Sequence, residues 1–198
     1  MRYCLVIDLN RCTGCEACIV SCKLENNVDL GTYWNRVLPV GPFGDFPDLQ
    51  QYWLPLQCQQ CENAECVRVC PTGASYRDEQ TNVVLIDKEK CIGCQYCVYA
   101  CPYGVRSYNN KQSVVEKCTL CSHLTMSGEG VPACVHNCCG GARFFGDLDD
   151  PESDVSKAVK AAEEKDPASI HRLGDPGNAH PSTIYILSES IATWKELM

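Results

Sequence analysis

The sequence predicts a mixed α+β fold in which four copies of one small unit form two nested modules. Cysteine makes up 18 of the 198 residues, and sixteen of these cysteines fall into four groups of four. A strand-like stretch rich in β-branched or aromatic residues precedes each group. Each group ends with two cysteines spaced by about one helical turn. Because repeated units of this kind bury their apolar faces against one another, we expect the four units to pack as two pairs.

The cysteine groups are numbered one to four along the chain. They are Cys12, Cys15, Cys18 and Cys22; Cys58, Cys61, Cys66 and Cys70; Cys91, Cys94, Cys97 and Cys101; and Cys118, Cys121, Cys134 and Cys138. Groups one and three share gaps of two, two and three residues, whereas the middle gap is four residues in group two and twelve in group four. Pro71 and Pro102 directly follow groups two and three. The glycines and proline in the long gap of group four predict a surface loop.

This spacing is typical of iron–sulfur proteins. In bacterial ferredoxins, three closely spaced cysteines bind one cube and the fourth, which precedes a proline, reaches a second cube. Gly14 and Gly93 occupy matching positions and tolerate the positive φ that such tight loops require. Structural zinc closes at four ligands and separates its cysteine pairs by longer spacers, and reduced cytosolic thiols form few disulfides. We therefore predict 4Fe-4S clusters, four in all, with each loop serving two of them.

The fold class that follows is α+β, with two nested ferredoxin-like two-cluster modules. Residues 58–110 are expected to form the inner module, and residues 1–30 and 111–147 the two halves of the outer module. An aromatic insertion at 31–57 and a cysteine-free C-terminal tail at 148–198 complete the chain. Before the four groups, strands are expected over 3–9, 51–56, 82–87 and 113–116.

The insertion is expected to be irregular. The stretch from Lys23 to Gln57 mixes glycine and proline with six aromatic residues, and Gly41-Pro42 is a typical loop dipeptide. We expect these aromatic side chains to cover the modules. The alternative is a docking surface for a larger partner, because aromatic residues are enriched in interfaces.

The tail has a different composition. Asp150 is a candidate N-cap with Pro151 in the first helical turn, and the acidic helix that follows has an apolar face of Val155, Val159 and Ala162. A strand is expected over 183–187 and a terminal helix over 191–197.

Two cysteines lie outside the regular spacing. Cys4 belongs to an apolar strand-like run, and we expect it to be a small buried side chain. Cys139 directly follows Cys138, so either could be the ligand. The three-residue gap from Cys134, which all four groups share, favours Cys138.

Several functional classes are excluded by the sequence. The net charge is −8, which does not suit a surface that neutralises nucleic-acid phosphates. The longest apolar runs are of strand length, and a membrane helix needs about twenty residues, so we expect no membrane span. The first residues do not match a secretory signal. No glycine-rich nucleotide loop or nucleophile–base pair is present, so we predict no catalytic residues in this chain.

The four groups, in this order and with these gaps, resemble the iron–sulfur subunits of molybdopterin oxidoreductases such as dimethyl sulfoxide, polysulfide, thiosulfate and arsenate reductases. The resemblance covers about residues 3–150. Its further elements are Val6-Ile7-Asp8, Cys22 to Asn26, Phe46-Pro47-Asp48, Pro71-Thr72-Gly73-Ala74, and Ala142-Arg143 with Gly146-Asp147-Leu148. One departure is Cys139, which stands where the family has proline.

The resemblance implies which cysteines share a cluster. The implied sets are Cys12, Cys15, Cys18 and Cys138 (cluster 1); Cys58, Cys61, Cys66 and Cys101 (cluster 2); Cys91, Cys94, Cys97 and Cys70 (cluster 3); and Cys118, Cys121, Cys134 and Cys22 (cluster 4). It also implies a molybdopterin-containing catalytic subunit as partner, together with a membrane anchor or another electron donor or acceptor subunit. The resemblance leaves two locations open. The chain is either exported with that partner as part of a membrane-associated complex, or it stays in the cytoplasm.

The predicted function is non-catalytic electron transfer between such partners within an oxidoreductase complex. The alternative is a free-standing polyferredoxin, which would carry the same clusters but meet its enzymes transiently. A zinc-stabilised interaction module is the third hypothesis. The aromatic insertion and the 59 residues after Cys139 favour a fixed subunit.

Overall fold

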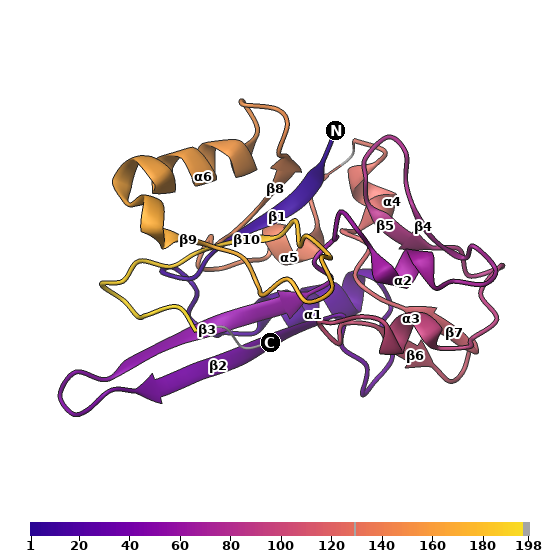
Figure 1. Cartoon of the computed structure of the whole chain (residues 1–198), viewed down its shortest axis with the longest axis horizontal. Helices are drawn as coiled ribbons and strands as arrows, with labels where there is room; N and C mark the ends of the chain where they lie inside the picture. The colour runs from indigo at the N-terminus through magenta and orange to yellow at the C-terminus, as the bar shows by residue number, and fades with distance from the viewer. Residues whose placement is uncertain (129, 196–198) are drawn as a thin grey trace.

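Strands from both ends of the chain form the central sheet. The computed structural model describes residues 1–128 and 130–195. Strand β1 (Tyr3–Asp8) pairs antiparallel with β8 (Arg143–Asp147) and parallel with β10 (Ile184–Ile186), and β9 (Ile170–His171) completes the order β8-β1-β10-β9 (Figure 1). The cysteine-free tail therefore contributes two strands to the central sheet, next to the strand that precedes group one.

Strand β1 is buried on both faces because its side chains alternate between two apolar clusters. Leu5 and Ile7 belong to the main core, whereas Cys4 and Val6 face a second cluster. Helix α6 (Asp154–Lys165) covers this second cluster with Val155 and its neighbours (Figure 1). The predicted burial of Cys4 and the predicted apolar face of the acidic helix are both confirmed.

The insertion is a β-hairpin, so the prediction of an irregular loop was wrong. Strands β2 (Asn35–Phe43) and β3 (Gln50–Gln57) pair antiparallel and extend away from the rest of the molecule (Figure 1). The pairing is regular up to Val40 and shifts before Phe43, and Gly41 and Gly44 have positive φ near this end. The glycines that suggested irregularity are thus concentrated where the hairpin turns.

Most of the insertion's aromatic residues contact the body of the protein. Trp34 and Tyr52 are buried in the main core, and Trp53 packs beside Cys18, Val37 and Cys134. Near the hairpin turn, Phe46 is 89% exposed. The buried aromatic side chains thus pack against the body of the protein, and whether they cover modules there stays a prediction.

Two smaller ribbons follow groups two and three. Strand β4 (Ser75–Arg77) pairs antiparallel with β5 (Val84–Ile86), and β6 (Ser107–Asn109) pairs antiparallel with β7 (Val114–Glu116). Each ribbon links one cysteine group to the next along the chain. Both lie at the opposite end of the molecule from the hairpin turn (Figure 1).

Short helices carry the third cysteine of each group and pack in pairs. Helix α1 (Ala17–Glu25) contacts α5 (Ala133–His136), which brings groups one and four together. Helix α2 (Glu65–Arg68) contacts α3 (Tyr96–Tyr99), which brings groups two and three together. A further single turn, α4 (Ser122–Thr125), lies within group four. Among the described residues, no helix is long and apolar enough to cross a membrane.

The acidic helix begins later than predicted. Its N-cap is Ser153, whose hydroxyl accepts a hydrogen bond from Ser156 N at 3.2 Å, and not Asp150. Asp150 instead accepts from Glu152 N at 2.9 Å within a turn. This local carboxylate–backbone bond competes with helix formation, so Pro151 lies outside the helix.

The predicted terminal helix does not form over residues 191–195, and residues 196–197 lie outside the described residues. Backbone N–H groups of this segment bond to strand β3 instead: Thr193 N donates to Gln50 Oε1 and Lys195 N donates to the Tyr52 hydroxyl. Trp194 stacks on His171 at 4.7 Å between ring centroids. Tertiary partners have replaced the local helical bonds.

Candidate iron–sulfur sites

All four cysteine loops share one backbone feature. Two residues after the first cysteine, φ is positive in each group: at Gly14, Gln60, Gly93 and Leu120. The predicted role of the two glycines is confirmed, and the glutamine and the leucine adopt the same conformation in the other two loops. Turns of this kind point successive backbone N–H groups toward one concave space, an arrangement suited to anionic iron–sulfur clusters.

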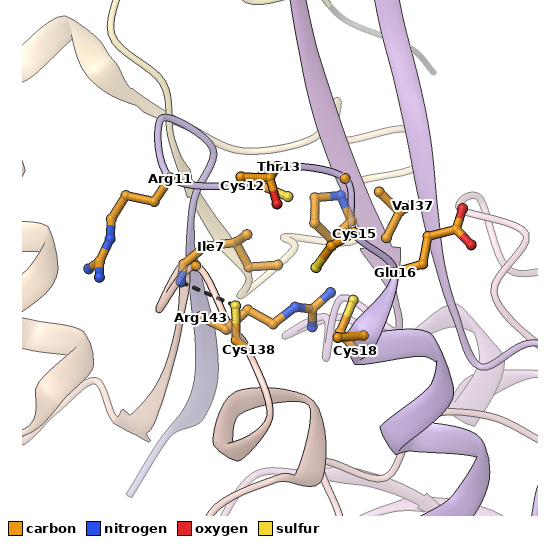
Figure 2. A pocket seen from close by; sticks show the side chains of 15 residues that line it. Ile7, Arg11, Cys12, Thr13, Cys15, Glu16, Cys18, Val37, Cys138 and Arg143 are labelled. Atoms are coloured by element: carbon orange, nitrogen blue, oxygen red, sulfur yellow. Dashed lines mark hydrogen bonds between the residues drawn. The ribbon is translucent and has the colours of Figure 1, made fainter.

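The thiols of Cys12, Cys15, Cys18 and Cys138 line one cavity (Figure 2). It measures about 370 Å³, including the solvent at its mouth, and lies between the loop of group one, strand β1 and the segment before β8. Ala142 N donates a hydrogen bond of 3.2 Å to Cys138 Sγ, drawn as the dashed line in Figure 2. We call this arrangement site 1. It contains the set of cysteines that the family resemblance implies for cluster 1.

A second cavity, of about 290 Å³, is lined by Cys70, Cys91, Cys94 and Cys97. Backbone N–H groups again reach the sulfurs: Ser75 N donates to Cys70 Sγ at 3.3 Å, and Val115 N donates to Cys91 Sγ at 3.4 Å. This is site 3, with the cysteines implied for cluster 3.

The remaining eight cysteines form two more deeply placed groups. In site 2, burial raises the pKa of Cys61 to about 12, and the neighbouring thiols of Cys58, Cys66 and Cys101 contribute to this rise. Both effects disfavour the isolated charged thiolate. The structure thereby brings together the four cysteines implied for cluster 2.

Site 4 contains Cys22, Cys118, Cys121 and Cys134. Burial raises the pKa of Cys22 to about 12, and the neighbouring thiols of Cys134 and Cys121 add to this rise. Cys118 lies beside Cys22 and Cys134. The Asn26 side-chain N–H₂ joins two of these sulfurs, donating to Cys121 Sγ at 3.5 Å and to Cys22 Sγ at 3.9 Å. These are the cysteines implied for cluster 4.

The arrangement of the thiols bears on the choice between zinc and a cluster. Among the described residues, no three cysteine, histidine, aspartate or glutamate side chains are arranged to hold a single metal ion. Zinc needs four ligand atoms at about 2.0–2.3 Å from one point. A cube, by contrast, takes one thiolate at each of four separated corners, so it does not require the four sulfurs to meet at one point.

The four sites follow one another in the order 1, 4, 2, 3. Cys18 of site 1 lies near Cys22 and Cys134 of site 4. Cys118 of site 4 interacts electrostatically with Cys58 of site 2. Arg106 contacts Cys66 of site 2 and also lines site 3. The two outermost sites have an exposed cysteine each, Cys15 in site 1 and Cys94 in site 3.

Three buried cations lie among the sites, and their role was not predicted from the sequence. Arg106 and Arg143 are close to thiols, whereas Lys117 Nζ donates to the backbone carbonyls of Cys118 and Val84. A usable pattern was present in the sequence, because each arginine stands five residues after the last cysteine of its group.

The two cysteines outside the regular spacing differ in environment. Cys4 is buried, and desolvation raises the pKa of its thiol to about 12. Cys139 is exposed at the rim of site 1, and its sulfur lies 3.2 Å from Cys15 Sγ, whereas Cys138 lines the cavity itself.

Comparisons with known proteins show the family of this chain. A profile of the 4Fe-4S dicluster domain matches residues 49–148. A protein of Halobacterium salinarum, assigned as the iron–sulfur B-type subunit of a dimethyl sulfoxide reductase, is 45% identical over 218 residues, covering 95% of this chain and 80% of the relative. The B-type subunit of the sulfite dehydrogenase of Allochromatium vinosum is 44% identical over 176 residues, covering 79% and 73%.

A more distant relative is similar over nearly its full length. The arsenate respiratory reductase iron-sulfur subunit ArrB of a Shewanella species is 32% identical over 244 residues, covering 98% of this chain and 99% of that protein. The family resemblance of the cysteine groups is therefore confirmed at the level of iron–sulfur subunits. This chain belongs to the 4Fe-4S dicluster family and, within it, to the B-type iron–sulfur subunits of reductase complexes.

Proposed function

We propose that this chain holds four 4Fe-4S clusters, one at each site, and relays electrons between a molybdopterin-containing catalytic subunit and a second redox partner. The observation that carries the proposal is the convergence of sixteen cysteines into four sets of four. When bound, such clusters supply one-electron oxidation and reduction. The chain's own residues hold them, exclude water and set their potentials.

The nested arrangement is part of this proposal. Sites 2 and 3 form the inner module, and sites 1 and 4 form the outer one. The pairing of helix α2 with α3 and of α1 with α5 supports this division, as does the pairing of β1 with β8. In each module the last cysteine of one group completes the site of the other group. Cys22 and Cys138 do so in the outer module, and Cys70 and Cys101 in the inner one.

The proposed path enters and leaves at the two outermost sites. Sites 4 and 2 are interior, and their Cys118, Cys134 and Cys58 are buried. Sites 1 and 3 each bring a cysteine to the surface, at Cys15 and Cys94. Cys94 has exposed apolar neighbours in the sequence: Ile92, and Tyr96 and Tyr99 of helix α3. Exposed aromatic side chains at this position favour contact with a partner.

Metal analysis and spectroscopy of the anaerobically purified chain test the number of clusters. We expect about sixteen iron and sixteen sulfide per chain, because each cube contains four of each. Four reduction steps should then appear in an EPR-monitored titration. A content near eight iron would leave one module without clusters, and zinc without sulfide would refute the proposal.

Co-purification separates a fixed subunit from a transient carrier. The chain should elute with a larger subunit that contains molybdopterin when both are expressed from neighbouring genes. A chain that always elutes alone and reduces several unrelated enzymes equally well would instead be a polyferredoxin. A colourless preparation would identify a zinc-stabilised interaction module.

A further inference from the structure

Arg106 and Arg143 occupy equivalent positions in the repeat. Each follows the last cysteine of its group by five residues, Cys101 in one case and Cys138 in the other. Arg143 is the first residue of β8, and Arg106 directly precedes β6, so each stands where a strand leaves its loop. The equivalent positions after groups one and two carry Asn27 and Ser75. Each two-site module therefore receives one arginine.

Arg143 lies between the two sites of the outer module. It lines site 1 with the four cysteines there, and Figure 2 shows its side chain extending from the side of Cys138 toward Cys18. It also interacts with Cys134 of site 4. Its Nη2 donates to Asn35 Oδ1 at 3.0 Å, which fixes the guanidinium in place. Only 4% of the residue is exposed.

Arg106 has the corresponding position in the inner module. Its Nη2 donates to Cys66 Sγ of site 2 at 2.7 Å and to Ser75 Oγ at 2.9 Å. The same side chain lines site 3 and interacts with Cys97 there. Only 5% of the residue is exposed.

Neither arginine is explained by an ion pair with a carboxylate. Among the described residues, no aspartate or glutamate lies within salt-bridge distance of Arg106 or Arg143. Nη1 of each guanidinium is buried and has no hydrogen-bond partner within the described part of the chain. A buried, unpaired cation is costly. Both side chains are therefore suited to an anionic group at the sites they border, and a thiolate-bound cluster is such a group.

We propose that Arg106 and Arg143 are potential-setting residues, each a fixed positive charge shared by the two clusters of one module. This inference rests on the proposed function, because it concerns the four clusters. A positive charge in a site of low dielectric stabilises the added electron, so each arginine raises the reduction potentials of both neighbouring clusters. Guanidinium groups stay ionised in proteins, which makes this charge permanent.

The consequence is that the potentials of the two clusters in one module depend on the same residue. An electron on either cluster of a pair interacts with the same cation. Arg143 is expected to act on clusters 1 and 4, and Arg106 on clusters 2 and 3. The two variants must therefore give complementary patterns of change, which a general loss of packing would not produce.

The test compares Arg106→Gln and Arg143→Gln in the iron-loaded chain, purified with its partner subunit. EPR-monitored titrations would measure the four potentials, with Cys15→Ser and Cys94→Ser used to assign the signals of clusters 1 and 3. We expect Arg106→Gln to disfavour reduction of clusters 2 and 3 by about tenfold or more, which is about 59 mV for a one-electron couple. Arg143→Gln should do the same to clusters 1 and 4.

Arg68→Gln is the matched control. Arg68 follows Cys66 by two residues but is exposed and paired with Glu65, so its removal should change the potentials much less. Arg106→Lys and Arg143→Lys retain the charge and should restore most of each potential. Equal shifts of all four clusters, or shifts no larger than those of Arg68→Gln, would overturn the inference.

Iron content separates the possible failures. If the wild-type chain contains far fewer than about sixteen iron atoms, the proposed function itself fails. If it holds them and the potentials do not change, only the inference fails. If a glutamine variant loses clusters while its lysine variant keeps them, charge is required and the inference is supported. Loss of clusters from both variants would indicate that the arginine acts by packing, and would overturn it.

Discussion

Trp53 of strand β3 packs against the cysteine loop at Gly14. A β-carbon added to Gly14 would lie 2.3 Å from Trp53 Cδ2, well inside normal contact distance. Gly14 also has a φ of +69°, which other residues seldom adopt. The hairpin thus lies in close contact with the loop that carries Cys12 and Cys15. Glycine at position 14 both leaves space for the Trp53 ring and adopts the positive φ.

Gly14→Ala should therefore weaken site 1. The matched control is Gly73→Ala, because Gly73 has a φ of +68° but nothing lies within 4 Å of its added β-carbon. Both variants carry backbone strain of about 1–3 kcal/mol, and only Gly14→Ala adds steric overlap of about 1–3 kcal/mol. The measurement is the rate of cluster loss in mild denaturant, followed by visible absorbance. Equal rates for the two variants would contradict the role of Trp53.

Cys4 should resist alkylation in the native protein. Burial raises the pKa of its thiol from 9.0 to about 12, so little reactive thiolate forms at about pH 8–9. Between these two values the unfolded chain loses the proton while the folded chain keeps it. The stabilising contribution of Cys4 is thus complete below pH 9 and is lost as the pH rises toward 12.

Mass spectrometry after a short iodoacetamide treatment measures this difference. Cys139 is the internal control: the Cys15 thiol raises the pKa of its thiol, but the side chain is exposed and should be labelled, whereas Cys4 should remain unlabelled until the chain is unfolded. The free energy of unfolding should fall with pH above 9 less steeply in Cys4→Ala, which lacks the titrating group. Similar labelling of both cysteines would show that Cys4 is accessible.

Trp194 should hold the C-terminal segment against the hairpin. Its ring stacks on His171 and on Tyr52, at centroid distances of 4.7 Å and 6.1 Å. We expect Trp194→Ala to cost about 2 kcal/mol from the lost aromatic pairs and buried area. Faster amide exchange in β9 and β10, with unchanged iron content, would show that the loss is local.

Ile191→Ala is the control, because Ile191 is exposed and precedes the stacked region. It should leave the exchange rates near those of the wild type. If Trp194→Ala leaves exchange as slow as Ile191→Ala does, the segment is held by its backbone bonds to Gln50 and Tyr52 and not by the indole ring.

The parts of the fold that depend on local chemistry were predictable from the sequence. Cysteine spacing and the two glycines determine the loops of groups one and three. The apolar run at 3–9 gives strand β1, and Val155 and Val159 give the face of α6. In each case the residue types and the periodicity of the apolar positions strongly favour one local conformation.

Tertiary contacts decided the remainder. Gln60 and Leu120 adopt positive φ because their loops wrap a site, and their residue types do not indicate it. Glycine and proline made the hairpin look irregular, although its regular pairing depends on partners in the core. The segment around Trp194 was expected to be helical, but bonds to β3 replace the helical ones. Arg106 and Arg143 were missed because each contacts thiols of two different sites, which come together only in the folded chain.

Cys138 and Cys139, the neighbouring cysteines at the end of group four, should differ in their effect on site 1. Cys138 lines site 1 and accepts a hydrogen bond from Ala142 N, whereas Cys139 is exposed beside Cys15. We propose Cys138 as the ligand. Cys138→Ser should therefore remove or convert the cluster of site 1, lowering the iron content by about one to four atoms per chain. Cys139→Ser is the matched control and should keep all four clusters and their potentials.

Iron analysis and EPR of both variants distinguish the two thiols. The signals of sites 2 and 3 should be unchanged in Cys138→Ser, because the inner module does not use this thiol. If Cys139→Ser loses the cluster and Cys138→Ser retains it, the assignment of the two residues is reversed. If each single variant keeps the cluster and only the double variant loses it, either thiol can complete site 1. That result would contradict a unique ligand. The sulfur of Cys139 lies only 3.2 Å from Cys15 Sγ, so the loop would then have enough freedom to bring Cys139 into the place of Cys138.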